Sequence, residues 1–436
     1  MTNRRNFIRQ MAVAGIASTI PSITHSKPNF NQTGSLKKSS DQKLIWANLL
    51  HLSYNMWEDN VPLKYRDENY QCSTCQEARE WAHPYRSFLT FDDSAWNILL
   101  QEMADAGMNM VVIDLGDAIQ YESHPEIAVK NAWSKDKLIS ELAKMRKSGL
   151  EPIPKLNFAT THDVWMGKYS RMVSTTKYYA VCQYLISEVI ELFGTPRFFH
   201  IGMDEKTAGH QNRHNYAVIR QNDLWWGDLY FYIGEIEKRS VRTWVWSDYA
   251  WHKPELFFRK MPKSVLQSNW YYGTEFNLNK LKDPTKTYVK LYNDLEEHGF
   301  DQIPTGSNHS NDINMEATVN YGKKVIDQSK LYGFMTAPWR PTLAPCLDRH
   351  KQAIAQIGRA LNMNKSGKPH GKYNIYISIG SLMNNYAKKL AKEEDYFKQL
   401  IDAPFRGNVN SALIRAVKGQ TILIQHDVPA PGPYSR

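Results

Sequence analysis

The residues with the clearest chemical potential are two adjacent carboxylates, Asp204 and Glu205. They end a segment, residues 198–205, that is apolar at its start. An apolar segment that ends in acids is typical of a strand that leaves a barrel interior at an active site. Two acids beside a scissile bond are the equipment that glycosidic bond cleavage requires. We therefore take Asp204 and Glu205 as the catalytic candidates; the alternative is that they only cap the segment that follows.

The elements around this segment alternate between strand and helix patterns. The predicted strands are residues 44–53, 109–115, 151–158, 197–203, 243–247, 264–271, 302–307 and 331–337. The predicted helices are residues 93–106, 134–148, 174–193, 223–239, a short one near 255, 285–298, 313–328 and 347–362. Eight such units predict an α/β fold, a (β/α)8 TIM barrel over residues 44–362. The alternative, an open doubly wound sheet, usually carries a Gly-rich phosphate turn after its first strand, and the sequence has none.

The carboxyl ends of the strands build the active site of such a barrel. Acids, amides and aromatic residues gather at the predicted ends, as a carbohydrate pocket requires for hydroxyl binding and ring stacking. The candidate substrate-binding residues are His200, His162, Asn157, Asp114, Trp246, Asp248, Trp270, Tyr271 and Trp339.

Several of these candidates have a structural interpretation as well. His200 could hold the acid Asp204, and His162 could brace a loop as well as orient the acid pair. Asp114 could be the partner of a neighbouring strand. The three tryptophans could simply pack at the barrel mouth.

Residues 199–205, FHIGMDE, resemble the strand-four His-x-Gly-Gly-Asp-Glu motif of family 20 glycoside hydrolases, the β-N-acetylhexosaminidases. Residues 153–162 are similar to that family's strand-three segment. The segments WVWSDYAW and LQSNWYYG lie where the family has sugar-stacking tryptophans. The resemblance implies a substrate-assisted retaining mechanism, in which the 2-acetamido oxygen attacks the anomeric carbon. Asp204 would then orient the acetamido group, and Glu205 would act as acid and base.

The sequence departs from the family pattern at several points. Met203 replaces a glycine, strand one ends without an arginine, and strand seven has no tyrosine. Trp339 is followed by Arg340 and a proline, without the family's nearby glutamate. Two alternatives follow. The substrate could lack an acetamido group, with Asp114 or Asp248 as nucleophile or base, or the chain could be a non-catalytic carbohydrate-binding barrel.

The N-terminal segment predicts export. Arg4 and Arg5 precede a short apolar stretch, residues 11–20, as in a bacterial twin-arginine signal. The alternative is a chance pair before a disordered tail. We assign residues 1–43 to the signal and a linker, and expect a periplasmic or extracellular location. The translocation machinery would be a transient partner, and no stable membrane span is expected after processing. Residues 363–436 break the strand–helix pattern and are interpreted as a partly disordered C-terminal appendage.

Charge and cysteine content restrict the remaining functions. The net charge is +10, but residues 1–43 and 363–436 carry +6 each, so the barrel is nearly neutral and no nucleic-acid partner is expected. The 13 Trp and 24 Tyr are compatible with a glycan substrate. Cys72 and Cys75 form a lone CxxC that could be a local disulfide, whereas Cys182 and Cys346 are expected to be buried packing residues. We expect no metal and no cofactor.

Overall fold

The computed structural model describes residues 43–67, 70–220, 222–366, 375–377, 411–417 and 420–427. The predicted export signal lies outside these ranges, as does its linker apart from residue 43. Within the described part of the chain, no helix combines the length and apolarity needed to cross a bilayer.

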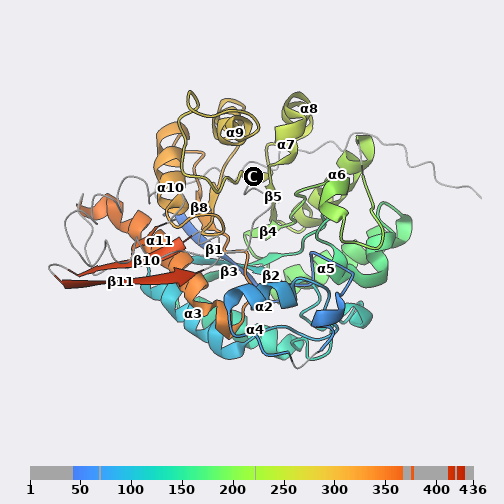
Figure 1. Ribbon diagram of the computed structural model, residues 1–436. Coiled ribbons are helices and arrows are strands. Elements are labelled where there is room, and N and C mark those ends of the chain that lie inside the picture. Colours follow the sequence, from blue (N-terminus) through green and yellow to red (C-terminus); the bar gives the residue numbers. More distant parts are fainter. Residues whose placement is uncertain are drawn as a thin grey trace, which may run out of the picture. The chain divides into compact units, whose positions relative to one another are not determined.

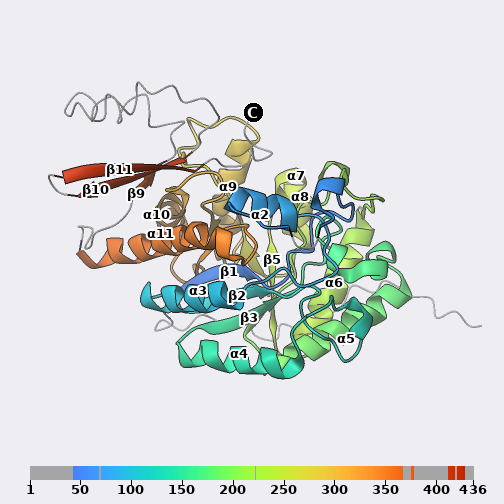
Figure 2. The same ribbon diagram turned by 60° about the horizontal axis from the view of Figure 1, so that its bottom comes forward.

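Eight parallel strands form the barrel, in the order β6-β5-β4-β3-β2-β1-β8-β7 (Figures 1 and 2). Isolated bridges pair Gln267 with Gln302 and Trp270 with Thr305, and so connect the β6 and β7 segments. The predicted (β/α)8 fold is therefore confirmed. The strands are β1 (Ile45–His51), β2 (Met110–Asp114), β3 (Glu151–Lys155), β4 (Phe198–His200), β5 (Arg242–Trp246), β6 (Leu266–Ser268), β7 (Thr305–Gly306) and β8 (Gly333–Thr336).

Helices follow the strands and cover the outside of the barrel. Their starts obey ordinary capping chemistry: Asp92, Ser134 and Thr175 accept backbone N–H bonds at the first turns of α3, α4 and α5. The main helices are α3 (Asp93–Asp105), α4 (Lys135–Lys147), α5 (Thr176–Leu192), α6 (Asp223–Glu237), α7 (Tyr249–His252), α8 (Pro254–Lys260), α9 (Thr285–Glu297), α10 (Asn314–Val325) and α11 (Leu347–Ser366). Short 3-10 turns are η1 (Leu63–Tyr65), η2 (Pro125–Ile127), η3 (Val164–Arg171), η4 (Ala208–Gln211) and η5 (Ala344–Cys346).

The core has two layers that follow the alternation of side chains along each strand. On β1, Trp46 and Leu50 belong to the large cluster between strands and helices, whereas Ala47 and Leu49 belong to a smaller cluster. The smaller cluster also contains Trp244 and other strand residues, so it fills the barrel interior. The interior thus provides a packed floor beneath the strand ends.

An additional helix, α2 (Cys75–Ala82), lies between β1 and α3 in the sequence. Its first residue, Cys75, forms a disulfide with Cys346 in η5. This bond corrects two expectations: Cys75 does not pair with Cys72, which is free, and Cys346 is buried but bonded. Cys182 is buried in α5, as predicted. The disulfide joins the segment after β1 to the segment after β8.

Beyond the barrel, the described residues contain a small antiparallel sheet of order β11-β10-β9. Its strands are β9 (Ile375–Ile377), β10 (Ser411–Val417) and β11 (Gln420–Asp427). The residue pattern of 373–379 predicts one strand in the C-terminal appendage, and β9 lies within this segment. A Lys-rich helix is also predicted at residues 382–400, which lie outside the described ranges.

Candidate active site

The acid pair lies directly after β4, where the backbone leaves the extended conformation. Gly202, Met203 and Glu205 have positive φ values of 69°, 76° and 49°. A regular strand would point Asp204 and Glu205 to opposite faces. The left-handed residues remove this alternation, so both carboxylates face the same histidine. A Cβ at Gly202 would lie 1.9 Å from Asn157 Oδ1, so only glycine fits there.

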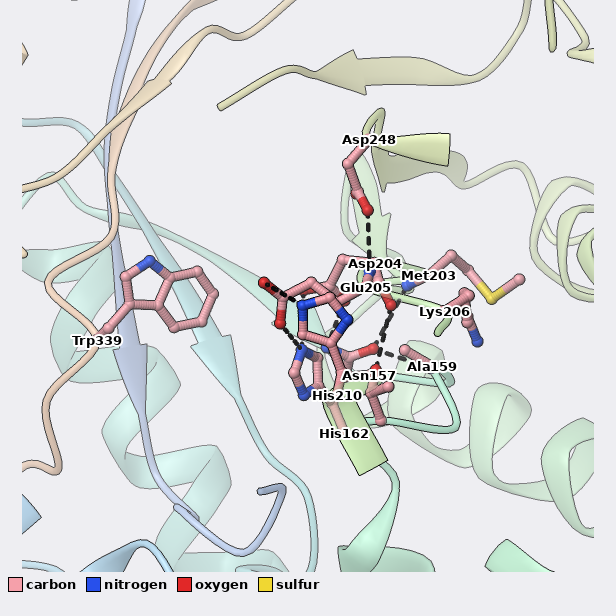
Figure 3. A network of polar contacts seen from close by, with 12 residues as sticks. Asn157, Ala159, His162, Met203, Asp204, Glu205, Lys206, His210, Asp248 and Trp339 are labelled. Carbon is pink, nitrogen blue, oxygen red and sulfur yellow. Dashed lines mark hydrogen bonds and ion pairs between the residues drawn. The ribbon is translucent and has the colours of Figure 1, made fainter. Parts of the chain in front are cut away.

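His162 joins the two acids (Figure 3). Its Nε2 lies 3.2 Å from Asp204 Oδ2 and 3.4 Å from Glu205 Oε2. Burial disfavours the charged imidazole, but the charges of Asp204 and Glu205 outweigh burial and raise the pKa of His162 to about 10. His162 is therefore a cation at neutral pH, placed between two carboxylates.

Asp204 is held as an anion. Burial alone would raise its pKa, but the charge and hydrogen bond of His162, with smaller contributions from Lys155 and Asn157, hold that pKa well below its usual range. Asn157 Nδ2 donates to Asp204 Oδ1 at 3.0 Å, and Thr161 Oγ1 donates to the Asp204 carbonyl at 3.2 Å. The carboxylate is thus ionised and fixed in direction.

Glu205 is the more accessible acid, with 20% of its side chain exposed against 6% for Asp204. His210 approaches it from η4, with Nε2 3.6 Å from Glu205 Oε1. Figure 3 shows the Glu205 carboxylate directed toward the side on which Trp339 lies. Glu205 is therefore the acid placed to reach a ligand.

Asp248 supports the backbone of Glu205 from the end of β5. Its Oδ2 accepts the Glu205 N–H at 2.9 Å (Figure 3), while its buried Oδ1 has no partner among the described residues. Burial, followed by the charge of Asp204 and then that of Glu205, raises the pKa of Asp248 to about 8. Asp248 is therefore mostly protonated at neutral pH, so that Oδ1 can donate or accept a hydrogen bond.

Deeper in the barrel, the remaining polar candidates, Asp114 and His200, have separate partners. Asp114 pairs with Lys155 of the neighbouring strand and lies 3.4 Å from His51. Asp114 is thus a partner of a neighbouring strand, which is the structural interpretation given above for this residue. His200 accepts the Gly202 N–H at 3.0 Å, and burial lowers its pKa well below the usual range, so it is neutral. His200 thus braces the turn that carries the acids.

Aromatic rings surround the acid pair. The ring centroid of Trp339 lies 5.9 Å from those of both Trp246 and Trp57, and the centroids of Trp57 and His162 are 4.8 Å apart. Trp246 is buried almost completely, whereas Trp339 is partly exposed. Trp339 also donates to Tyr272 Oη at 2.7 Å. Trp57, Trp246 and Trp339 therefore form one aromatic wall beside His162.

Of the other two predicted aromatic residues, Trp270 lies further along this wall and Tyr271 packs away from it. Trp270 stacks on Tyr272 at 5.1 Å and so connects to Trp339. Tyr271 instead packs edge-on against Phe276 at 5.1 Å. The contacts of Tyr271 thus lead toward α9 and α10, and its role in substrate binding stays a prediction.

Sequence reasoning missed Trp57, His210, Lys155 and Tyr272. Tyr272 adjoins two predicted residues, and Lys155 ends β3, so their positions carried a signal. Trp57 and His210 lie in loops, where periodicity gives no direction for a side chain. No group of three or more His, Cys, Asp or Glu that could hold a metal ion occurs in the described ranges.

Comparison with known proteins gives two kinds of similarity. No family model matches the chain. A "Glycosyl hydrolase family 109 protein" of Shewanella pealeana is 30% identical over 83 residues, which cover 19% of this chain and 18% of that protein. A protein of the same description from Shewanella baltica is 57% identical over 30 residues, 7% of this chain and 6% of that one. The chain thus spans less than a fifth of the length of these curated relatives.

Three solved structures are also similar. A family 20 exo-β-N-acetylglucosaminidase from Vibrio harveyi, in complex with N-acetylglucosamine, is 14% identical with a TM-score of 0.47, covering 73% of this chain and 54% of that one. A chitobiase from Flavobacterium johnsoniae is 15% identical with a TM-score of 0.46, covering 61% and 46%. A β-N-acetylhexosaminidase from Bacteroides fragilis is 11% identical with a TM-score of 0.46, covering 82% and 71%. The strand order of this chain itself establishes the barrel.

Proposed function

We propose that this protein is a glycoside hydrolase that acts on N-acetylhexosamine-containing or related glycans by a substrate-assisted, retaining mechanism. The observation that carries the proposal is the bridge of His162 between Asp204 and Glu205, at 3.2 and 3.4 Å. It gathers two acids of different exposure at the end of β4, beside an aromatic wall. Binding alone does not need two adjacent acids held in this way.

The two acids have separate tasks in this proposal. The acetamido oxygen of the substrate attacks the anomeric carbon as the glycosidic C–O bond breaks, and Glu205 gives its proton to the leaving oxygen. The ionised Asp204 accepts the acetamido N–H and stabilises the positive charge of the oxazolinium ring. Water then attacks the anomeric carbon as the bond from that carbon to the acetamido oxygen breaks, and gives a proton to Glu205, which restores both the acetamido group and the enzyme.

The neighbouring carboxyl groups support an internal nucleophile from the substrate. Asp114 is engaged by Lys155 inside the barrel. Asp248, with its pKa raised to about 8, is mostly protonated at neutral pH and is a poor nucleophile in that form. To act as the nucleophile for a sugar without an acetamido group, Asp114 would have to leave Lys155, or Asp248 would have to lose its proton.

The test is the variant Glu205→Gln, with Glu297→Gln as its matched control on the exposed surface of α9. Glutamine fills the same volume but cannot supply a proton. We expect hydrolysis of an unactivated N-acetylglucosamine disaccharide to fall by about 10²–10⁴. The loss should be smaller for a 4-nitrophenyl glycoside, whose leaving group needs less protonation.

The outcomes separate the enzyme from a binding module. If Glu205→Gln hydrolyses the unactivated glycan at the wild-type rate, Glu205 is not the general acid. Glycan binding by the wild-type protein, measured by calorimetry, with no turnover of any substrate in a glycan panel would instead favour a non-catalytic carbohydrate-binding barrel.

We also propose that the protein is exported through the twin-arginine route. Arg4 and Arg5 supply the motif. The disulfide between Cys75 and Cys346 supports this proposal, because such bonds persist in oxidising compartments.

A further inference from the structure

The loop after β4 places a second histidine against Glu205. His210 lies in η4, and its Nε2 is 3.6 Å from Glu205 Oε1. His162 faces the other oxygen, Oε2, at 3.4 Å. Figure 3 shows the two imidazoles next to each other, each with a dashed contact to one oxygen of the Glu205 carboxylate. Each oxygen of the proposed general acid therefore has its own imidazole.

Local hydrogen bonds direct His210 toward Glu205. Thr207 N–H donates to the Glu205 carbonyl at 2.8 Å, and His210 N–H donates to the Thr207 carbonyl at 3.2 Å. The resulting turn brings the His210 ring back over Glu205. His210 Nδ1 lies 2.7 Å from Thr207 Oγ1, which fixes the ring and leaves Nε2 facing the carboxylate. The geometry is thus built by the loop itself.

The two imidazoles differ in what they can do. His162 is buried and shared with Asp204, and its pKa is raised to about 10, so it stays a cation. His210 contacts only Glu205 of the acid pair, and its side chain is 39% exposed. Because His210 is partly exposed, its ring can move with the Glu205 carboxyl group as Glu205 gives and regains a proton. His162, in contrast, is also held by its contact with Asp204.

We propose that His210 is a positioning residue for Glu205, which holds the carboxyl group in the orientation needed to protonate the leaving oxygen. This inference rests on the proposed function. The distance of 3.6 Å is longer than a hydrogen bond. Catalytic contacts are often long in ligand-free sites and shorten in the substrate complex.

Other titratable groups also face this pair. Asp204 lies beside Glu205 and is bridged to it through His162, and Asp248 accepts the Glu205 N–H. On α7, burial lowers the pKa of His252, and the nearby His210 lowers it further. The test therefore uses substrates that differ in leaving group, at one fixed pH, because several groups could contribute to a pH profile.

The experiment compares His210→Ala with His210→Gln on two substrates, an unactivated N-acetylglucosamine disaccharide and a 2,4-dinitrophenyl N-acetylglucosaminide. We expect His210→Ala to lower kcat on the disaccharide by about 10-fold, a part of the contribution of general acid catalysis. It should change kcat on the activated substrate by less than about 2-fold, because that leaving group departs without a proton. Glutamine keeps an N–H donor, so His210→Gln should restore most of the disaccharide rate.

Two controls isolate the effect. His298→Gln changes an exposed histidine at the C-terminus of α9 and should leave both rates unchanged. In a Glu205→Gln background, His210→Ala should lower the rate no further, since it acts through Glu205. Thermal unfolding of each variant checks that the fold is intact.

Four outcomes would each overturn the positioning role and leave the glycosidase proposal standing. They are equal slowing on both substrates, no slowing in His210→Ala, no recovery of the rate in His210→Gln, and an additive loss in the Glu205→Gln background. Absence of hydrolysis by the wild-type protein would overturn both.

Discussion

Among single residues, the carboxyl groups around β4 and β5 divide into an anion and a neutral acid. Burial favours the neutral form of both, but the cationic His162 faces Asp204 directly, whereas Asp248 accepts the backbone N–H of Glu205 on Oδ2. The pKa of Asp204 is therefore lowered and that of Asp248 is raised to about 8. His162 is thus the largest of the causes that make Asp204, and not Asp248, the charged aspartate.

This difference predicts a pH-dependent effect of Asp248→Asn on stability. In the folded protein, Asp248 keeps its proton up to about pH 8, whereas the unfolded chain loses it near pH 4. The contribution of this group to the free energy of unfolding is complete below pH 4 and is lost as pH rises to 8. Asparagine resembles the protonated acid and does not titrate.

We therefore expect Asp248→Asn to become more stable relative to wild type as pH rises from 5 to 8, as measured by urea unfolding at several pH values. Asp105→Asn, on the exposed surface of α3, controls for the change from carboxyl to amide. A stability difference that does not vary with pH would contradict the neutral state of Asp248.

The charge of Asp204 leads to a prediction about mechanism. If the acetamido group is the nucleophile, a thiazoline analogue of the cyclised intermediate should inhibit tightly, because it resembles a species close to the transition state. Asp204→Asn should lower kcat and weaken this inhibitor together, since both effects depend on the negative charge beside the ring nitrogen.

Comparable turnover of glucosides and N-acetylglucosaminides by the wild-type protein, without thiazoline inhibition, would reject substrate assistance. It would still be compatible with a glycoside hydrolase that uses another carboxylate.

Among the elements, the end of β4 determines whether the acid pair can form. β4 ends at His200, and Gly202 then adopts a φ of 69°, where an added Cβ would lie 1.9 Å from Asn157 Oδ1. Gly194, after α5, has a φ of 67°, but a Cβ added there would meet nothing within 4 Å. The two glycines share a backbone conformation and differ in their surroundings.

This pair predicts separate effects for two alanine variants. Gly194→Ala should cost only the strain of a left-handed alanine, about 1–2 kcal/mol, and leave activity unchanged. Gly202→Ala adds a clash with Asn157, which must move and give up its bond to Asp204. We expect a larger loss of stability and loss of hydrolysis, measured by urea unfolding and by disaccharide turnover. Similar effects of both variants would show that the contact with Asn157 is unimportant.

The sequence predicts elements better than it predicts loops. Periodicity located all eight strands, because buried parallel strands are short apolar runs followed by helices with recognisable caps. The strands are shorter than predicted where positive φ values or turns follow, as after His200 in β4. The bond between Cys75 and Cys346 could not be predicted, because it depends on closure of the barrel across 271 residues.

In the site, too, residues at strand ends are predicted better than residues in loops. Asp204, His162 and Asn157 end or closely follow predicted strands, and the structure brings them into contact. His210 and Trp57 reach the acid pair only through the shapes of the loops after β4 and β1. A histidine five positions after Glu205 is the only sequence signal for this contact.

At the scale of the whole molecule, the proposed export links the disulfide to the N-terminal arginines. Cys75 and Cys346 join the segments that follow the first and last strands of the barrel. Cytosolic reductants keep most such thiols reduced, so the bond is expected to form after export. Location and covalent state should therefore change together.

The last prediction tests this link with the double variant Arg4→Lys, Arg5→Lys. The change preserves charge and removes only what the export receptor recognises, so the precursor should stay inside the cell. There, Cys75 and Cys346 should be reduced and react with a maleimide after denaturation, whereas exported wild-type protein should be labelled only at Cys72 and Cys182. The control Lys37→Arg, Lys38→Arg alters the same segment and should be exported normally. Normal export of the double variant would exclude the twin-arginine route, and a disulfide formed in retained protein would separate this bond from export.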